Sequence, residues 1–244
     1  MYASNANSTV ISTSTEKATV GNNGSTKLKT SQNIISIFRR GRFGNNMCQY
    51  AAALGIAKKL NITFVIDPTK RYSFSDVNLQ KIFKITHLGN IPDRKHMKWL
   101  RYEERKPSIY GDEWKGLPKG RNIILWGFFQ SVRYFEDIQN EIRNEFTFID
   151  SIQEQADSLL TRTLISRPDT ITVGIHIRRG DKAHSPTNIE PTAYFKVSMD
   201  YMRQKYGKVT FLVATDSRDW ALKTDLLPGD DVVILEEASG EVSI

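Results

Sequence analysis

Apolar residues follow a regular pattern only from about residue 33, where a strand and then a helix are predicted. Residues 33–38 form a short apolar run, which is typical of a buried strand. Apolar side chains then recur at helical spacing over residues 47–60. The apolar face of this predicted helix consists of Met47, Tyr50, Ala51, Leu54, Ala57 and Leu60. Residues 1–32 are aperiodic and rich in Ser, Thr and Asn, so we expect a disordered tail or stem there.

The pattern is less regular in the next hundred residues. Two apolar runs, 63–66 and 122–129, predict two further strands. Residues 70–120 mix short patterns with Gly and Pro and predict only short helices and loops. One more helix is predicted from four apolar side chains at helical spacing, namely Phe135, Ile138, Ile142 and Phe146. Ser151 and Glu154 resemble a capping box that opens another helix.

The second half of the chain alternates strands and helices more clearly. The pattern predicts strands at 171–177, 209–214 and 232–235, and helices at 191–206 and 220–222. The β-branched apolar run at 171–177 is typical of a buried strand. Gly207 follows the longer helix, where glycine is a favourable stop. Because strands alternate with helices, we predict a parallel, Rossmann-like sheet.

This pattern indicates two α/β domains. We expect the first over residues 33–165 and the second over residues 166–244. The second is shorter than the roughly 100 residues or more that are usual for a domain of this type. The sequence therefore predicts an incomplete second domain, with one sheet edge and one side of its ligand cleft uncovered.

The first strand of the second domain ends in a cluster of polar residues. Arg178, Arg179, Gly180 and Asp181 follow it directly, and His176 lies just before its end. Ligands bind at the carboxyl ends of strands in open α/β sheets, and paired guanidiniums suit a phosphate. Alternatively, the arginines form a solvated strand end and the histidine is hydrogen-bonded in the core. The Arg-Gly-Asp tripeptide is also bound by some adhesion receptors, but so short a string recurs often by chance.

A second polar turn lies between the first predicted strand and helix. It contains Gly41, Arg42, Gly44, Asn45 and Asn46, an arrangement that suits an anion or a sugar at a helix N-terminus. Neither nucleotide-binding glycine fingerprint is present, so an ordinary strand–helix connection is the alternative.

Aromatic residues mark the end of the strand predicted at 122–129. Trp126, Phe128 and Gln130 lie there, and such a group forms either a platform for a sugar or part of the core.

Charge and composition narrow the choice of ligand. The formal net charge is +7 and the pI about 9.4, which favours acidic partners such as nucleotides and phosphosugars. No dense run of Lys and Arg with interleaved aromatics supports nucleic-acid binding.

Other sequence features bear on metals, membranes and modification. Cys48 is the one cysteine, and four scattered histidines make a zinc site unexpected. No apolar stretch reaches the ~20 residues of a membrane helix. Asn7, Asn23 and Asn61 begin glycosylation acceptor triplets.

Four segments together resemble the α-1,2-fucosyltransferases. Residues 41–51 read Gly-Arg-Phe-Gly-Asn-Asn-Met-Cys-Gln-Tyr-Ala, which resembles the first family segment. Residues 127–131 read Gly-Phe-Phe-Gln-Ser, and 176–181 read His-Ile-Arg-Arg-Gly-Asp, which matches the donor motif. Residues 211–216 with Trp220 resemble the following strand and its Asp/Trp segment.

The resemblance implies a GT-B architecture, with two Rossmann-like domains facing a cleft. It implies transfer of L-fucose from GDP-fucose to the 2-hydroxyl of a terminal galactose on a glycan, with inversion. It also implies residence in the Golgi membrane on the lumenal side, through an N-terminal anchor that this sequence does not contain. No partnership with nucleic acid is implied. Cys48 stands where the family usually has an aromatic residue.

The same resemblance assigns roles to residues. The donor-binding set is Arg178, Arg179, Gly180, Gly41, Arg42, Gly44, Asn45 and Asn46. The acceptor-binding set is Trp126, Phe128 and Gln130. The candidates for the group that accepts the acceptor hydroxyl proton are Asp181, His176 and Asp216, among which the sequence does not choose. No Asp-x-Asp motif is present, so we expect the arginines to replace a metal cofactor.

The chain also ends before a later family segment that helps complete the donor site. From this we expect a weak or inactive enzyme for the chain as given. A catalytically inactive sugar- or nucleotide-binding relative and a nucleic-acid-binding domain are the alternative functions.

Overall fold

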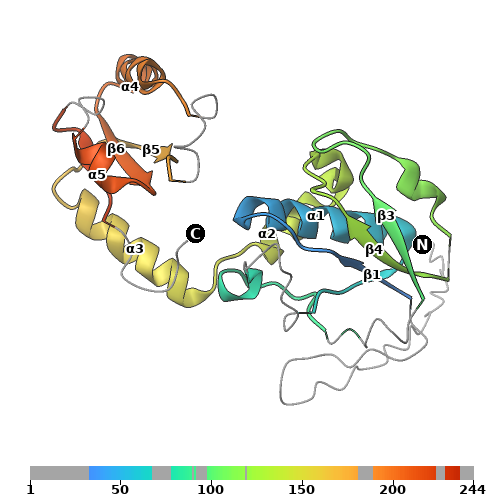
Figure 1. The fold of residues 1–244 in the computed structure, drawn as a ribbon. Helices are drawn as coiled ribbons and strands as arrows, with labels where there is room; N and C mark the ends of the chain where they lie inside the picture. The colour runs from blue at the N-terminus through green and yellow to red at the C-terminus, as the bar shows by residue number, and fades with distance from the viewer. Residues whose placement is uncertain are drawn as a thin grey trace, which may run out of the picture. The chain divides into compact units, whose positions relative to one another are not determined.

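The computed structural model describes residues 33–67, 78–89, 91, 98–118, 120–180, 189–223 and 229–236. The chain divides into two compact units, Met1–Ile149 and Asp150–Ile244. Each unit has its own sheet (Figure 1). The predicted tail, residues 1–32, lies outside the described residues.

The first unit is built on a four-stranded parallel sheet in the order β2-β1-β4-β3. Its strands are β1 (Ile34–Ile37), β2 (Thr63–Phe64), β3 (Trp99–Glu103) and β4 (Asn122–Trp126). All four residues of β1 are buried, because β1 lies inside the sheet and both of its faces are covered. The parallel pairing means that β1, β3 and β4 all end at the same edge of the sheet.

Helix α1 (Phe43–Leu60) packs against this sheet and provides most of the core (Figure 1). Its buried residues include the predicted apolar positions Tyr50, Ala51 and Leu54. The helix begins four residues before the first residue of its apolar face, and the Asn46 N–H donates to the Arg42 carbonyl at 3.1 Å in its first turn. It ends at Asn61, whose left-handed conformation (φ 53°) closes the last turn.

The chain's one cysteine, Cys48, lies on α1 and is half-buried. Burial raises the pKa of its thiol. The thiolate is therefore disfavoured at neutral pH.

The other elements of the first unit are short. They are η1 (Leu79–Lys81), η3 (Glu113–Gly116), η4 (Val132–Tyr134), η5 (Glu136–Ile138) and α2 (Gln139–Glu145). The helix predicted around residues 135–146 is thus divided into a 3-10 turn and a short α-helix. The prediction over 70–120 missed strand β3, whose apolar and charged residues do not form a long run.

A buried carboxylate joins three segments of this unit. Glu145, at the end of α2, accepts hydrogen bonds from the Tyr50 hydroxyl and from the Thr86 backbone N–H at 2.8 Å. Burial, and then the hydrogen bond to Glu145, raise the pKa of Tyr50 far above its ordinary value. The contacts attach the segment after η1 to both helices.

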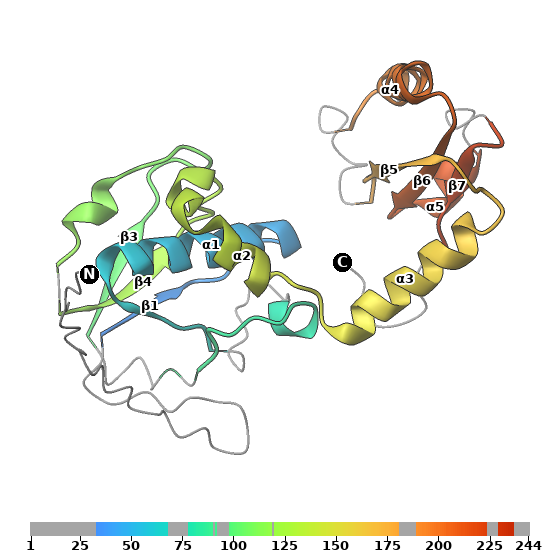
Figure 2. The same cartoon turned by 180° about the vertical axis from the view of Figure 1, so that it is seen from behind.

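The second unit has a three-stranded parallel sheet in the order β5-β6-β7 (Figure 2). Its elements are α3 (Asp150–Leu164), β5 (Ile171–Ile177), α4 (Thr192–Tyr206), β6 (Val209–Thr215), α5 (Arg218–Lys223) and β7 (Val232–Ile234). Helix α3 belongs to this unit, whereas the sequence pattern had assigned it to the first domain. A short connection leads from α3 into β5, where the Arg167 N–H donates to the Leu164 carbonyl.

Helix α4 covers one face of this sheet. Phe195 and Met199 contact the strand residues Ile177, Val209 and Val213, which form the core of the unit. On the opposite side of the sheet lies α3, which has no buried side chain (Figures 1 and 2).

Strand β5 was predicted to be buried, and this prediction is wrong. It is an edge strand of the described sheet, with β6 as its neighbour, and its side chains alternate between the α4 side and an exposed side. Val173, Ile175 and Ile177 face the core, whereas Gly174 and His176 are exposed. The exposure of His176 also disagrees with the alternative of a core histidine.

Among the described residues, no helix is both long and apolar enough to cross a membrane.

Candidate functional site

The turn between β1 and α1 is held by two buried amide side chains. Asn46 donates from Nδ2 to the carbonyls of Gly41 (3.0 Å) and Arg42 (2.9 Å). Gln49 exchanges two hydrogen bonds with the backbone of Arg40. Because both amides are almost completely buried, they maintain the shape of the turn. The predicted donor contact of Asn46 is therefore less favoured than a structural role.

The remaining predicted residues of this turn differ in their surroundings. Gly41 has a positive φ of 76°, a backbone conformation that favours glycine, and a Cβ there would also contact the Asn45 side chain. Gly44 is exposed with open space around it, and Arg42 is exposed. Asn45 accepts a hydrogen bond from Gln130 at 2.7 Å.

The residues after β4 form a second turn, which Glu104 organises. Its carboxylate accepts the backbone N–H groups of Phe128 (2.7 Å) and Phe129 (3.0 Å). Gly127 (φ 156°) lies so close to Glu104 that a Cβ would clash with the Glu104 Cβ, and Phe129 is left-handed (φ 49°). These bends explain why β4 ends at Trp126, three residues earlier than predicted. Glu104 carries no local sequence signal, so sequence reasoning missed it.

Trp126 does not offer a face to a sugar in this arrangement. Its ring stacks on Phe38 at 3.8 Å between centroids, and the Arg101 guanidinium lies 3.9 Å from its centroid. Both groups lie too close to the ring to share one face, so the Trp126 ring lies between Phe38, which follows β1, and Arg101 of β3. The packing alternative therefore fits Trp126 better than the predicted acceptor platform.

Phe128 and Gln130 lie at the carboxyl edge of the same sheet. The Arg40 guanidinium is 4.7 Å from the Phe128 ring centroid. Gln130 is exposed, donates to Asn45 and accepts a hydrogen bond from the Ser108 hydroxyl at 2.8 Å. Two of the segments predicted to bind ligands, 41–46 and 126–130, are thus brought together.

In the second unit, the arginine turn is held by Asp216. The Asp216 carboxylate, which follows β6, accepts the backbone N–H groups of Arg179 (2.7 Å) and Gly180 (3.0 Å). A Cβ on Gly180 would be 2.9 Å from Asp216 Oδ2, so this close approach requires glycine. The parallel pairing of β5 with β6 brings the two turns together at the carboxyl edge of the sheet.

The ionisation of Asp216 follows from these contacts. Burial, the largest single effect, would raise the pKa of its carboxyl group, whereas the hydrogen bonds from the N–H groups of Arg179 and Gly180 lower it. The Ser217 hydroxyl and the charge of Arg178 act in the same direction, so the pKa lies below its usual value. Asp216 is therefore ionised at neutral pH, and its oxygens already accept hydrogen bonds.

The two arginines differ in their contacts. The Arg179 guanidinium lies over the Trp220 ring of α5, 3.9 Å from its centroid. Arg178 is half-buried. Asp181, a predicted catalytic residue, lies outside the described residues, and the predicted His176 is exposed just before this turn.

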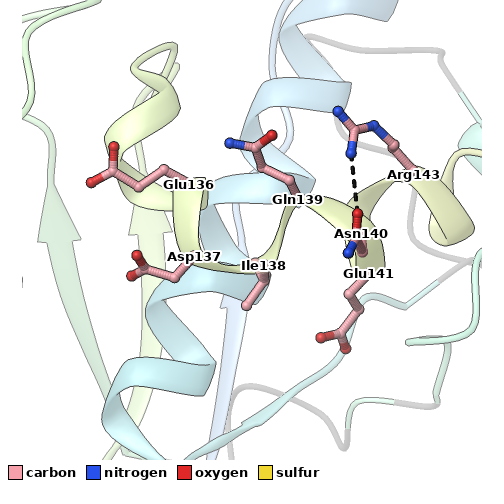
Figure 3. A pocket seen from close by; sticks show the side chains of 7 residues that line it. All are labelled: Glu136, Asp137, Ile138, Gln139, Asn140, Glu141 and Arg143. Carbon is pink, nitrogen blue, oxygen red and sulfur yellow. Dashed lines mark hydrogen bonds between the residues drawn. The ribbon is translucent and has the colours of Figure 1, made fainter.

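Two concave surfaces of the first unit differ in character. One is a shallow surface of about 460 Å³ formed by a single segment, residues 136–143 (Figure 3). Its labelled side chains diverge, and Arg143 is hydrogen-bonded to Asn140, so no group of side chains converges on a ligand. The other is a cavity of about 160 Å³, and its lining includes Tyr102, Tyr110 and Tyr134. Ser108, which lies between lining residues in the sequence, donates a hydrogen bond to Gln130.

Within the described ranges, no group of three or more His, Cys, Asp or Glu side chains is arranged to hold a metal ion.

Two parallel α/β sheets, with an arginine turn at the carboxyl edge of one, define an α/β protein suited to an anionic ligand. The fold is similar to that of the fucosyltransferase NodZ from Bradyrhizobium, with a TM-score of 0.54 and 18% identity over 85% of this chain and 80% of that chain. A structure of NodZ α-1,6-fucosyltransferase soaked with GDP-fucose gives a TM-score of 0.52 at 17% identity, over 85% of this chain and 79% of that chain. These similarities confirm the predicted α/β, GT-B-like fold class.

The chain belongs to glycosyl transferase family 11, whose pattern matches residues 4–234. It is 30% identical over 207 residues to galactoside alpha-(1,2)-fucosyltransferase 1 of Alouatta belzebul, covering 80% of this chain and 54% of that protein. The enzyme of the same name from Sus scrofa is 29% identical over 206 residues, with the same two coverages. The chain thus spans about half the length of these relatives. The resemblance seen in the sequence is confirmed at the level of the family.

Proposed function

We propose that the protein transfers L-fucose from GDP-fucose to the 2-hydroxyl of a terminal galactose on a glycan, with inversion at the fucose carbon. The observation that carries this proposal is the arginine turn of a family 11 chain, held by Asp216 at the carboxyl edge of a parallel sheet. Membership of the family supports the donor and the acceptor, since similar proteins are named galactoside alpha-(1,2)-fucosyltransferases.

Arg178 and Arg179 act on the donor diphosphate. When the bond between fucose and diphosphate breaks, negative charge grows on the leaving GDP. Guanidiniums fixed next to that charge stabilise the transition state more than the ground state, by an amount on the order of 3 kcal/mol for each well-placed group. Gly180 allows the backbone to turn closely under them.

Asp216 is assigned a positioning role in this scheme. Its oxygens accept two backbone N–H groups, and its pKa is lowered, so it is a poor acceptor for the proton of the galactose hydroxyl. His176 and Asp181 remain the candidates for that step. Both flank the arginine pair in the sequence.

The acceptor glycan is assigned to the first unit. Gln130 presents a polar side chain at the carboxyl edge of its sheet, near Phe128, and it donates a hydrogen bond to Asn45 of the turn before α1. Trp126 packs against Phe38 and Arg101 at this edge, so its role is structural and it does not stack on a sugar.

Residence in the Golgi lumen is proposed from the family resemblance. The Asn61 acceptor triplet lies at the end of α1 with the Asn61 side chain exposed, so the site is accessible to glycosylation. Asn7 and Asn23 are first changed to Gln, because their triplets would obscure the result. After expression in a secretory pathway, endoglycosidase treatment should shift the mass of this double variant but not that of the same chain with Asn61→Gln added.

The decisive experiment is incubation with labelled GDP-fucose and a panel of galactosides. Arg178→Lys and Arg179→Lys keep the charge but lose the planar fork, so calorimetry should show markedly weaker GDP binding. Unchanged GDP affinity in both variants would remove the assignment of the arginines. GDP binding without transfer to any galactoside would identify an inactive nucleotide-binding relative, and tight, salt-sensitive binding of DNA or RNA would favour a nucleic-acid-binding domain.

A further inference from the structure

The side chain of Arg179 is held by an aromatic ring of the neighbouring turn. Its guanidinium lies 3.9 Å from the centroid of Trp220, which belongs to α5. The backbone of the same arginine donates to Asp216, four residues before that tryptophan. The β6–α5 segment therefore fixes both the main chain and the side chain of Arg179.

Such a contact changes the cost of binding an anion. A free arginine side chain loses rotamer entropy when it is immobilised on a ligand, which opposes binding. A guanidinium that already lies over an indole ring has lost much of this freedom before the anion binds.

We propose that Trp220 is a positioning residue for nucleotide binding, which acts by holding the Arg179 guanidinium ready for the diphosphate. The inference rests on the proposed function, in which Arg179 binds the GDP diphosphate. Trp220 itself contacts the arginine and not the reacting atoms. The β6–α5 segment is thus a support for the donor site and not only part of the packing.

The test compares GDP binding to the full chain and to its variants by calorimetry. Trp220→Leu should weaken GDP binding by about 3- to 10-fold, as expected for the loss of a partly exposed cation–π contact. Trp220→Phe keeps a π-face and should restore part of the affinity. The control is Leu222→Ala, an exposed position of the same helix, which should bind like the wild type.

A double variant separates positioning from general packing. If Trp220 acts through Arg179, then Arg179→Lys combined with Trp220→Leu should bind GDP no worse than Arg179→Lys alone. Tryptophan fluorescence gives a second readout, because GDP should change the emission of the wild type and much less that of Trp220→Phe. Thermal unfolding establishes whether each variant is folded. If Trp220→Leu does not fold, the proposal is tested by the GDP affinity of Trp220→Phe and by the change in fluorescence.

Inorganic pyrophosphate is titrated in parallel, so that the two proposals fail separately. Wild-type binding of pyrophosphate but not GDP would remove the proposed donor and leave the Trp220 comparison intact. Unchanged affinity for both anions in Trp220→Leu, or an effect that simply adds to that of Arg179→Lys, would overturn the inference. Absence of wild-type binding to either anion would overturn both proposals.

Discussion

At the scale of single residues, the donor-side turn depends on a glycine and a carboxylate in direct contact. Gly180 is needed because Asp216 approaches it closely, and Asp216 is needed because two backbone N–H groups point at it. Neither role follows from the residue types alone. A Gly after two arginines is a common turn signal, and an Asp after a strand could equally be a catalytic group.

Gly180→Ala should therefore damage the turn. The new methyl group would displace the Asp216 carboxylate and weaken its hydrogen bonds to the turn. Loss of a charge-assisted hydrogen bond costs about 1.5 kcal/mol, and a loss of that size in binding free energy would make GDP binding about tenfold weaker. Gly174→Ala is the matched control, since a Cβ at this position of β5 has nothing within 4 Å. Equal GDP affinities of the two variants in calorimetry would show that the contact does not support the binding site.

At the scale of elements, an ion pair attaches α4 to the start of β7. Arg203 donates from Nε and Nη2 to the two oxygens of Asp231, at 2.8 and 3.0 Å. The hydrogen bond from Arg203 is the main cause that lowers the pKa of Asp231. A lowered carboxyl pKa contributes stability above the unfolded value, ~3.9, and this stability is lost as the pH falls through the folded value.

Arg203→Met should lower the free energy of unfolding of the second unit by about 1–2 kcal/mol at pH 7, since the pair is partly exposed. As the pH falls from about 4 toward the lowered folded pKa of Asp231, the wild type should progressively lose this advantage, so the difference between the two proteins should shrink. Urea unfolding of the full chain at pH 7 and pH 3, followed by circular dichroism, measures the difference. The exposed Lys196→Met on the same helix serves as the control, and a difference independent of pH would contradict the role of the pair.

Sequence patterns predicted the long elements and missed the contacts that end them. The periodicity of α1 and α4 and the apolar runs of β1, β5 and β6 are local properties, so they can be read from the chain. The end of β4 depends on Glu104, which lies 24 residues before Phe128 and reaches it only through the pairing of β3 with β4. For the same reason the burial of β5 was misjudged, because exposure depends on which strands and helices surround it.

At the scale of the whole molecule, the site predicted from the sequence is divided between two units. Residues 41–46 and 126–130 lie in the first, and 176–180 lie in the second. The sequence placed the boundary after residue 165, whereas the compact units divide after Ile149. The helical pattern after Ser151 could be recognised, but which sheet the helix would join could not.

Transfer should not require a divalent metal. The chain has no Asp-x-Asp motif, and the arginine pair offers positive charge for the diphosphate. Fucose transfer to a galactoside should therefore be unchanged in excess EDTA. Loss of activity in EDTA, followed by recovery with Mn²⁺ or Mg²⁺, would contradict this prediction, and a metal-dependent glycosyltransferase assayed in the same buffer controls for the chelator.

The half-buried Cys48 allows the rate of local opening of α1 to be measured. Because the chain has one cysteine, a thiol reagent modifies one position, and the raised pKa of this thiol makes the reaction of the closed helix slow. Labelling should then follow local opening of α1 and accelerate in mild denaturant, before global unfolding. Mass spectrometry of the alkylated chain gives the rate. Labelling as fast as that of a free cysteine would mean that the thiol is already accessible in the closed helix.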